Sequence, residues 1–173
     1  TGLALALAGC GTMGANEAPL AKTEVVAQPD PENLDPIAAA AFWGTRFDRN
    51  PMDAETALKF SKALRDIESH QESLRVMQQT ASRYQQDPDV LLEFGKALIA
   101  NERAHEAVRP IEQAISLGKN SDWSAYSALG VAYDMTNRHI EAREQYDRAL
   151  SSAPDPAKVL NNKGLSYALS GWH

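Results

Sequence analysis

The chain has 173 residues, of which 43% are hydrophobic and 23% are charged, a composition typical of a soluble globular protein. The formal net charge is −6, because 23 acidic residues outnumber the 17 basic residues spread among them. Binding to nucleic acid needs clustered lysine and arginine, so nucleic acid is not an expected partner. The longest uncharged apolar run lies at the start of the chain and is far shorter than the roughly 20 residues of a membrane-spanning helix.

That apolar run, TGLALALAG at residues 1–9, closes on small residues as the end of a signal peptide does. It contains neither an initiator methionine nor a basic residue, so we interpret it as a truncated signal peptide. Residues 11–34 are polar and contain three prolines, with little apolar periodicity. We therefore expect residues 10–34 to form a flexible linker rather than part of a packed domain.

Cys10 is the only cysteine, so no disulfide can form within the chain. The string Leu7-Ala8-Gly9-Cys10 resembles the bacterial lipobox, which implies cleavage by signal peptidase II before Cys10 and a diacylglyceryl group on its thiol. Gly11 stands where aspartate would resemble an inner-membrane retention signal, which favours the outer membrane. The alternative is a small buried side chain in an N-terminal helix. A metal-binding or catalytic thiol is less favoured, because no histidine, aspartate or second cysteine is near.

From residue 54 onward the chain repeats itself with a period of about 34 residues. Gly95, Gly130 and Gly164 are separated by 35 and 34 residues, and Ser61 precedes Gly95 by 34. A leucine or tyrosine follows each of these small residues by three positions, and further small and large residues keep the same steps. These positions are Leu64, Leu98, Tyr133 and Tyr167; Ser73, Ala107 and Ala142; Met77, Ile111 and Tyr146; and Thr80, Ala114 and Ala149.

This pattern resembles the tetratricopeptide repeat (TPR), most clearly in WSAYSALGVAYDMTNRHIEAREQYDRALSSAPD. We assign repeats to 54–87, 88–121 and 123–156 and a partial repeat to 157–173, with one extra residue at Asp122. The resemblance implies an all-α fold, a right-handed TPR superhelix of helix-turn-helix repeats, preceded by a disordered lipoprotein tether.

The spacing has a physical reason, because small residues let the two helices of a repeat cross closely while larger side chains fill the gaps. Asn137 and Gly171 fall between two helices, where a left-handed residue ends the first helix. Pro88 and Pro154 mark junctions between repeats. The first repeat is the weakest match, since it has Ser61, Ser73 and Thr80 where glycine or alanine is usual.

Two further expectations concern the ends of the repeat region. Residues 35–51 are expected to form a leading helix, over 36–49, that packs on the first repeat through Phe42, Trp43 and Phe47. The partial fourth repeat holds only one helix, at about 158–170, whose covering helix would have to follow His173. We therefore expect the chain to be a fragment truncated at both ends.

No arrangement of residues predicts catalysis. His70, His105 and His139 are spaced by 35 and 34 residues, but each is expected in the turn of its own repeat, too far from the others to share a metal ion. No zinc-protease, serine-hydrolase, phosphate-loop or paired-cysteine motif occurs. We predict that the chain is not an enzyme and has no cofactor, metal or small-molecule substrate.

The surface that remains is the inner groove that TPR superhelices usually offer to peptides or helices. By the repeat register its candidate residues lie on the first helix of each repeat, with more basic residues toward the first repeats. The alternative for any one of them is an ordinary solvated helix residue. The candidates are Glu55, Leu58, Lys62 and Arg65; Leu92, Lys96 and Ile99; Ser127, Val131 and Asp134; and Lys158, Asn161 and Leu165.

The stretches FWGTRFDRNPMDAETALKFSKALR and LNNKGLSYALSG, together with the lipobox and the linker, resemble the TadD family of Tad (Flp) pilus assembly lipoproteins. The resemblance implies a scaffold, anchored by lipid in the outer membrane and facing the periplasm, that helps to assemble or place the pilus secretin. The alternatives are a periplasmic TPR adaptor of another envelope secretion or pilus pathway and the regulatory TPR region of a longer enzyme.

Overall fold

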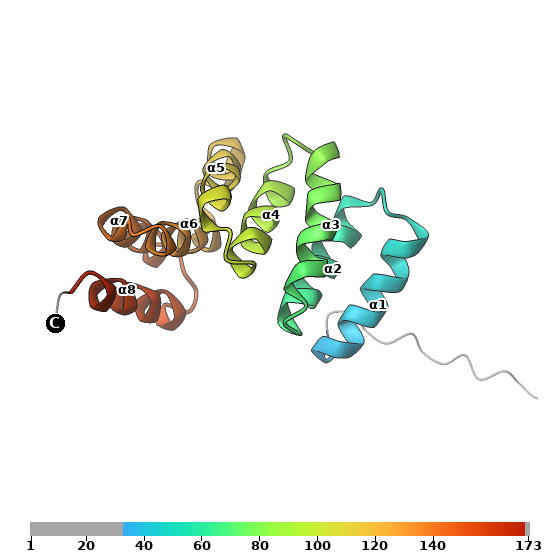
Figure 1. Ribbon diagram of the computed structural model, residues 1–173, viewed down its shortest axis with the longest axis horizontal. Coiled ribbons are helices and arrows are strands. Elements are labelled where there is room, and N and C mark those ends of the chain that lie inside the picture. Colours follow the sequence, from blue (N-terminus) through green and yellow to red (C-terminus); the bar gives the residue numbers. More distant parts are fainter. Residues whose placement is uncertain (1–32, 172–173) are drawn as a thin grey trace, which may run out of the picture.

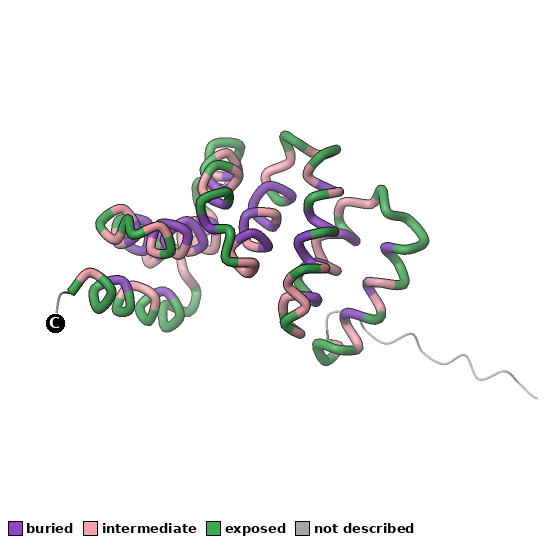
Figure 2. The backbone as a smooth tube through the Cα atoms, viewed as in Figure 1, coloured by how far each residue is buried: buried purple, intermediate pink, exposed green. Residues whose placement is uncertain are grey.

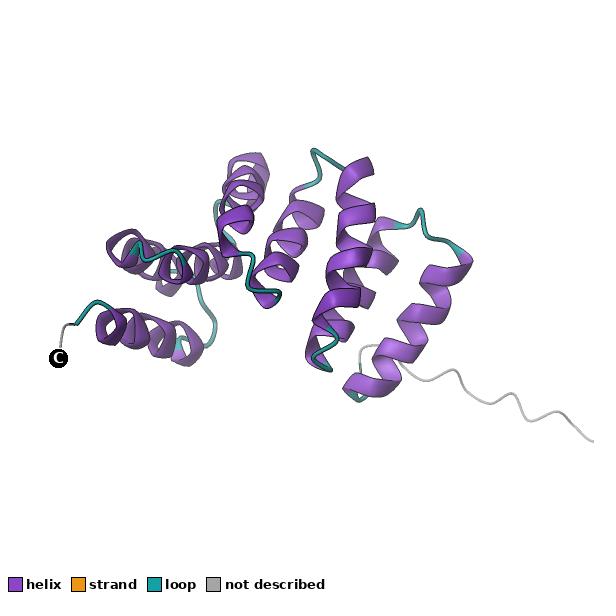
Figure 3. Ribbon diagram, in the orientation of Figure 1, coloured by secondary structure: helices purple, strands orange, loops and turns teal. Residues whose placement is uncertain are grey.

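A computed structural model describes residues 33–171, and within this range the chain forms helices joined by short connections, with no strand (Figures 1 and 3). The expectations for the signal peptide, for Cys10 and for nearly all of the linker lie outside the described residues. The helices are α1 (Pro36–Arg49), α2 (Ala54–Asp66), α3 (His70–Arg83), α4 (Pro88–Ala100), α5 (Ala104–Ala114), α6 (Trp123–Met135), α7 (His139–Leu150) and α8 (Ala157–Leu169), with a π-helical turn at Ile115–Lys119.

An aspartate begins the first helix of each of the three complete repeats. Asp53, Asp87 and Asp122 are the N-caps of α2, α4 and α6, and each carboxylate accepts a hydrogen bond from a backbone N–H of the first turn. Asp35 caps α1 in the same way. This contact satisfies N–H groups that the start of a helix leaves unpaired.

Left-handed residues end the first helix of each repeat. Asn137 has a φ of 61° and Gly171 a φ of 77°, as their positions in the register predict. Glu68 and Glu102 take the same conformation at the equivalent places, although glutamate adopts it less readily than asparagine or glycine. After Glu68, Glu102 and Asn137 the next backbone N–H donates back to a carbonyl of the preceding helix, for example Arg138 N to Tyr133 O at 2.8 Å. The repeated turn sends the second helix of each repeat back along the first.

The glycines of the repeat allow these helix pairs to approach closely. A Cβ added at Gly95 would lie 2.3 Å from Ile111 Cγ1, and one at Gly130 would lie 2.5 Å from Tyr146 Cε1. A Cβ at Gly164 would meet nothing within 4 Å. The face of α8 that corresponds to the packed faces of α4 and α6 is therefore uncovered by the described residues.

The first repeat replaces these glycine and alanine contacts with hydrogen-bonded polar groups. Ser61 and Ser73 are fully buried, and their hydroxyls lie 2.9 Å apart. Thr80 Oγ1 donates to the carbonyl of Val76 within α3. The departure from the repeat pattern thus leaves none of these three hydroxyls unpaired in the core.

Helix α1 packs on α2 as an additional helix before the first repeat (Figure 1). Trp43 and Phe47 are buried, and Phe42 is half-buried beside Trp43 in an edge-to-face contact. Ala63 of α2 belongs to the same apolar cluster as Trp43. The aromatic side of α1 therefore closes the N-terminal end of the core.

The extra residue of the second repeat lies in the π-helical turn Ile115–Lys119, where Gly118 has a φ of 136°. The expectation that Asp122 is the extra residue is wrong, because Asp122 caps α6 as Asp87 caps α4. The segment between α5 and α6 takes up the extra residue where Gly118 departs from helical geometry, and α6 still begins one residue after its aspartate cap.

The two sides of the solenoid are packed differently. Helices α2, α4, α6 and α8, the A helices, each contact the next A helix along the chain. Helices α3, α5 and α7, the B helices, are farther apart, with no Cα atom of one within 8 Å of a Cα atom of another. Because elements that touch lie on the shorter arc, the A helices form the inner side of the curved array. Burial follows the shared core between the two layers and falls off along α8, where Leu160, Leu165 and Leu169 are exposed (Figure 2).

Candidate functional site: the inner groove

A hollow of about 240 Å³ lies on the inner side between the A helices of the first three repeats. Leu58 and Leu92 are its apolar lining residues, and Lys62 and Lys96 also line it. Asp122 and Ser124 close the far end from the start of α6. The structure therefore brings together Leu58, Lys62, Leu92 and Lys96, which the repeat register assigns to a groove.

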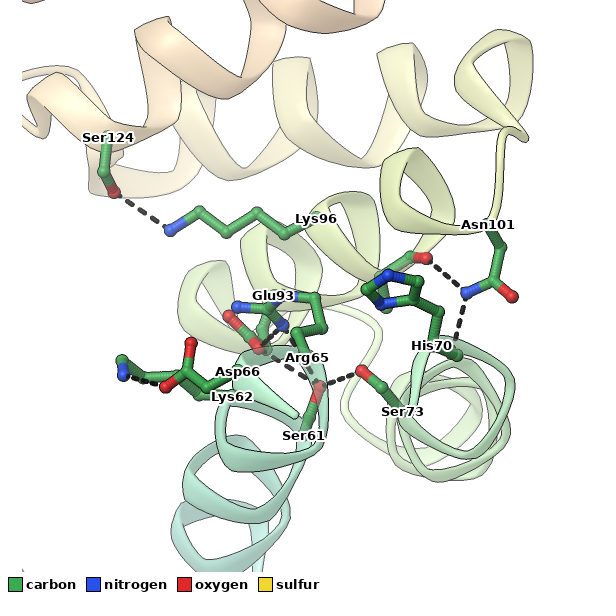
Figure 4. Close-up of polar contacts among 11 residues, drawn as sticks. Ser61, Lys62, Arg65, Asp66, His70, Ser73, Glu93, Lys96, Asn101 and Ser124 are labelled. Carbon is green, nitrogen blue, oxygen red and sulfur yellow. Dashed lines mark hydrogen bonds and ion pairs between the residues drawn. The ribbon is translucent and has the colours of Figure 1, made fainter. Parts of the chain in front are cut away.

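Lys96 crosses this hollow from α4 toward α6 (Figure 4). Its Nζ donates to Ser124 Oγ at 3.0 Å, which links the second repeat to the third. Burial lowers the pKa of Lys96 below its ordinary value of 10.5, and the nearby carboxylate of Glu93 opposes this effect. A partly buried ammonium with one neutral protein partner is a donor suited to an incoming carbonyl or carboxylate oxygen.

The side chain of Arg65 lies in a contact between two repeats and is not open to a partner in the groove. Its guanidinium forms an ion pair with Glu93 of α4, and the two side chains are 17% and 12% exposed. Glu93 also accepts a hydrogen bond of 3.1 Å from Ser61 (Figure 4). Arg65 and Glu93 therefore join the first repeat to the second at the wall of the groove.

Lys62 is the most accessible cation of the hollow, with 68% of its side chain exposed. Its Nζ donates to Asp66 Oδ2 at 2.7 Å, an exposed pair four residues apart on α2. Lys59 and Lys62 also line a second hollow between α1 and α2, where Trp43 forms part of the wall. Lys59 Nζ lies 4.7 Å from the centre of the Trp43 ring. The groove thus continues past the first repeat onto α1.

Asp134 lies at a junction of three helices. Its carboxylate accepts hydrogen bonds from Tyr146 of α7 and Ser166 of α8, at 2.9 and 2.7 Å, and lies 2.8 Å from His139 Nδ1. Burial and the hydrogen bond to Asp134 raise the pKa of Tyr146 well above its ordinary range. Asp134 therefore holds α6, α7 and α8 together.

Three of the remaining candidates share another, smaller hollow, and the others are spread along the inner side. Val131 lines a small hollow between α6 and α8 together with Leu165 and Asp134. Ile99 and Ser127 are half-buried, whereas Glu55, Lys158 and Asn161 are exposed. The structure thus separates the predicted set into one cluster over the first three repeats, a smaller one between α6 and α8, and scattered positions.

Sequence reasoning missed Lys59, Asp122 and Ser124 as groove residues. Asp122 and Ser124 belong to the cap and first turn of α6, and their equivalents Asp87 and Asp89 could have shown that each A helix begins at the groove. Lys59 stands three positions before Lys62, on the adjoining part of the same helix face. This helical spacing was the one feature of the sequence that could have predicted Lys59 as a groove residue.

The three repeat histidines begin the B helices, past the turns in which they were expected: His70 and His139 are first in α3 and α7, and His105 is second in α5. In residues 33–171 no group of three or more histidine, cysteine, aspartate or glutamate side chains is arranged to hold a metal ion. None of the helices described is both long and apolar enough to cross a membrane.

Comparisons with known proteins place the fold. No protein-family model matches the chain, and a search of curated proteins finds no match. Among solved structures, the chain is similar to MamA from Desulfovibrio magneticus RS-1, with a TM-score of 0.65, 19% identity, and coverage of 80% of this chain and 77% of that one. A thermophilic TPR protein of Thermus thermophilus matches with a TM-score of 0.61 and 19% identity, over 75% of this chain and 72% of that one. The first TPR domain of human RPAP3 matches with a TM-score of 0.61 and 17% identity, over 70% of this chain and 95% of that domain. The fold is a TPR solenoid.

In this TPR solenoid the inner groove is the side on which successive A helices meet. The hollow over α2, α4 and α6 draws residues from three repeats, so its shape depends on their stacking. Such a composite surface suits recognition of another protein by a rigid helical scaffold.

Proposed function

We propose that this chain is a non-enzymatic scaffold that binds a segment of a partner protein in its inner groove. The observation that carries the proposal is the hollow in which Leu58 and Leu92 lie beside the ammonium groups of Lys62 and Lys96. Apolar side chains of a bound segment would cover the two leucines, and its carbonyl or carboxylate oxygens would accept hydrogen bonds from the lysines. This combination of an apolar centre and a polar rim is usual in protein interfaces.

The proposal extends to the place of action. We propose that Cys10 carries lipid, that the scaffold faces the periplasm from the outer membrane, and that it acts in Tad (Flp) pilus assembly with the secretin or another Tad component as partner. Support comes from the Leu7-Ala8-Gly9-Cys10 string and from the two TadD-like stretches. Stable attachment by lipid requires more than one acyl chain, which mature bacterial lipoproteins have.

The anchor and the groove can be tested separately in the native bacterium. The full-length protein, its Cys10→Ser form and its Lys62→Glu form are expressed with an affinity tag, and Arg49→Glu on exposed α1 serves as the matched charge-reversal control. We expect Cys10→Ser to leave the membrane fraction while still capturing secretin. We expect Lys62→Glu to stay at the membrane and to lose most of the captured secretin, with no loss for Arg49→Glu.

Three results would contradict parts of this proposal. Unchanged membrane attachment of Cys10→Ser removes the lipoprotein assignment. Equal capture by Lys62→Glu and wild type removes the inner groove as the binding site. Absence of the secretin and of every other Tad component from the wild-type capture removes the pilus assignment but leaves the scaffold assignment standing.

A further inference from the structure

The outer side of the solenoid, opposite the inner groove, carries a further hollow between α3 and α5, which we call the outer hollow. No Cα atom of one of these two B helices lies within 8 Å of a Cα atom of the other, and the space between them has a cavity volume of about 510 Å³. This lies within the range of roughly 300–1,000 Å³ that is usual for ligand pockets. None of its lining residues belongs to the inner groove described above.

The floor of this outer hollow is apolar and its wall is mostly polar and uncharged. Ala81, Leu91, Phe94 and Pro110 supply the apolar surface, with Phe94 and Pro110 half-buried. The side chains of four glutamines stand around it: Gln78, Gln85, Gln86 and Gln113. Gln113 Nε2 donates to the carbonyl of Gln85 at 3.1 Å, which ties α5 to the loop at the end of α3.

Arg109 is the one charged residue among those that line the outer hollow, and the lining contains no carboxylate. Within residues 33–171 its guanidinium has no hydrogen bond, ion pair or ring contact. The carboxylates nearest along its helix are engaged elsewhere: Glu106 pairs with Arg103, and Glu112 accepts a hydrogen bond from Tyr133. A chain with a net charge of −6 thus keeps an unpaired cation beside an apolar floor.

The next interface along the solenoid shows how the same space is filled when the chain supplies the side chains itself. By the repeat register Ala81 corresponds to Ile115, Leu91 to Tyr126 and Gln113 to Arg148. Ile115 and Tyr126 pack against the core there, and the Arg148 guanidinium lies 5.8 Å from the centre of the Tyr126 ring. Between α3 and α5 the smaller residues leave that volume open.

We propose that the outer hollow is a second docking surface, which takes an acidic segment of a partner protein that inserts a bulky apolar side chain. The inserted side chain occupies the volume that Ile115 and Tyr126 fill one repeat later. A neighbouring carboxylate of the segment pairs with Arg109, and the glutamine amides hydrogen-bond to its backbone, since each amide can both donate and accept. The inner groove and the outer hollow are then two separate binding sites on one scaffold.

The test uses random dodecapeptides displayed on phage and selected on the immobilised whole chain. We keep the phage that free wild-type protein releases and that free Ala81→Ile protein does not release. Ala81→Ile copies the next interface and fills the hollow without adding charge. We expect the enriched peptides to combine a tryptophan, phenylalanine or leucine with aspartate or glutamate. By fluorescence anisotropy a selected peptide should bind Ala81→Ile at least about ten-fold more weakly than wild type, because the inserted side chain loses its site.

Charge is tested with two substitutions at the same repeat position. Arg109→Gln should weaken the selected peptide about three-fold, the size expected of one exposed ion pair. Arg75→Gln, one repeat earlier and paired with Glu72, should leave the affinity unchanged. Ser82→Glu, an exposed change on the rim, provides a second blocking variant if Ala81→Ile does not fold.

Four results would overturn the proposal. They are enrichment of basic peptides, failure to enrich any peptide, equal binding to wild type and both blocking variants, and equal losses for Arg109→Gln and Arg75→Gln. A fifth result is a dimer, detected by sedimentation of the whole chain, that Ala81→Ile dissociates, because a second copy of the chain would then fill the hollow.

Discussion

Arg65 of α2 and Glu93 of α4 form an ion pair whose two side chains are less than one-fifth exposed, at 17% and 12%. Ser61 completes this group by donating to the same carboxylate. Because the pair joins helices of different repeats, it acts on how the repeats stack rather than on either helix alone. A largely buried pair is costly to break by removing one partner and inexpensive to replace as a whole.

We predict a strong coupling between these two residues. Arg65→Met or Glu93→Leu alone should each lower the free energy of unfolding by about 3 kcal/mol, because each leaves one charge buried without its partner. The double variant should lie within about 1 kcal/mol of wild type. Urea unfolding of the four proteins measures the coupling, and additive losses would contradict it.

The glycines of the repeat should respond oppositely to alanine. Gly130→Ala should destabilise the protein by about 1–3 kcal/mol, since the new methyl group would overlap the Tyr146 ring. Gly164→Ala should stabilise it by up to about 1 kcal/mol, because alanine favours the helix and the site is open. Thermal unfolding of the two variants compares them, and a loss at Gly164 would show that its site is not open in solution.

Replacing the left-handed glutamate between α4 and α5 should stabilise the protein. Glu102 has a φ of 61°, a conformation that costs about 1–2 kcal/mol for most residues and less for asparagine. Glu102→Asn should therefore raise the free energy of unfolding by about 1 kcal/mol. Asn137→Ala, which removes the favoured residue from the equivalent position, should lower the free energy of unfolding by a similar amount. Two changes of the same sign would contradict the explanation.

Lys96 should make stability depend on alkaline pH. Its pKa is lower in the folded state than in the unfolded state, so the unfolded state binds more protons between the folded value and 10.5. The cost of keeping Lys96 charged is full below the folded pKa and is relieved as the pH rises through it. Lys96→Met should remove this gain in stability with rising pH. Urea unfolding repeated from pH 7 upward should therefore show a smaller slope of the free energy of unfolding against pH for Lys96→Met than for wild type.

The comparison with wild type in that experiment is essential because Tyr133 and Tyr146 act in the opposite sense. Burial raises the pKa of both phenols, so the folded state retains their protons above pH 10 and loses stability there. Both tyrosines are present in wild type and in Lys96→Met, so their contribution cancels in the difference. Identical pH profiles would show that Lys96 is not desolvated in the folded state.

The repeat spacing was sufficient to predict the register of the helices. Residues 54, 88, 123 and 157 begin the four assigned repeats, and α2, α4, α6 and α8 begin at the same residues. This succeeds because the small residues and the turn residues must recur wherever two helices cross and reverse. The recurrence of residue types along the sequence carries that information without any knowledge of how the repeats stack.

Side-chain partners across repeats could not be predicted in the same way. Arg65 and Asp134 occupy groove positions in the register, but Glu93 and Ser166, about one repeat later in the sequence, determine where they point. The outer hollow likewise depends on Ala81 being small where Ile115 is large, which is visible only when two interfaces are compared in space. Contacts between repeats depend on stacking geometry, which the period alone does not contain.

Successive A helices lie close together and successive B helices lie farther apart, so the solenoid should straighten more easily than it curves further. Tighter curvature would press together inner helices that already touch, and packed interiors resist compression. Straightening meets no such resistance on the outer side until the B helices come together. A segment wedged into the inner groove would therefore lengthen the molecule from end to end, and it would narrow the outer hollow as it did so.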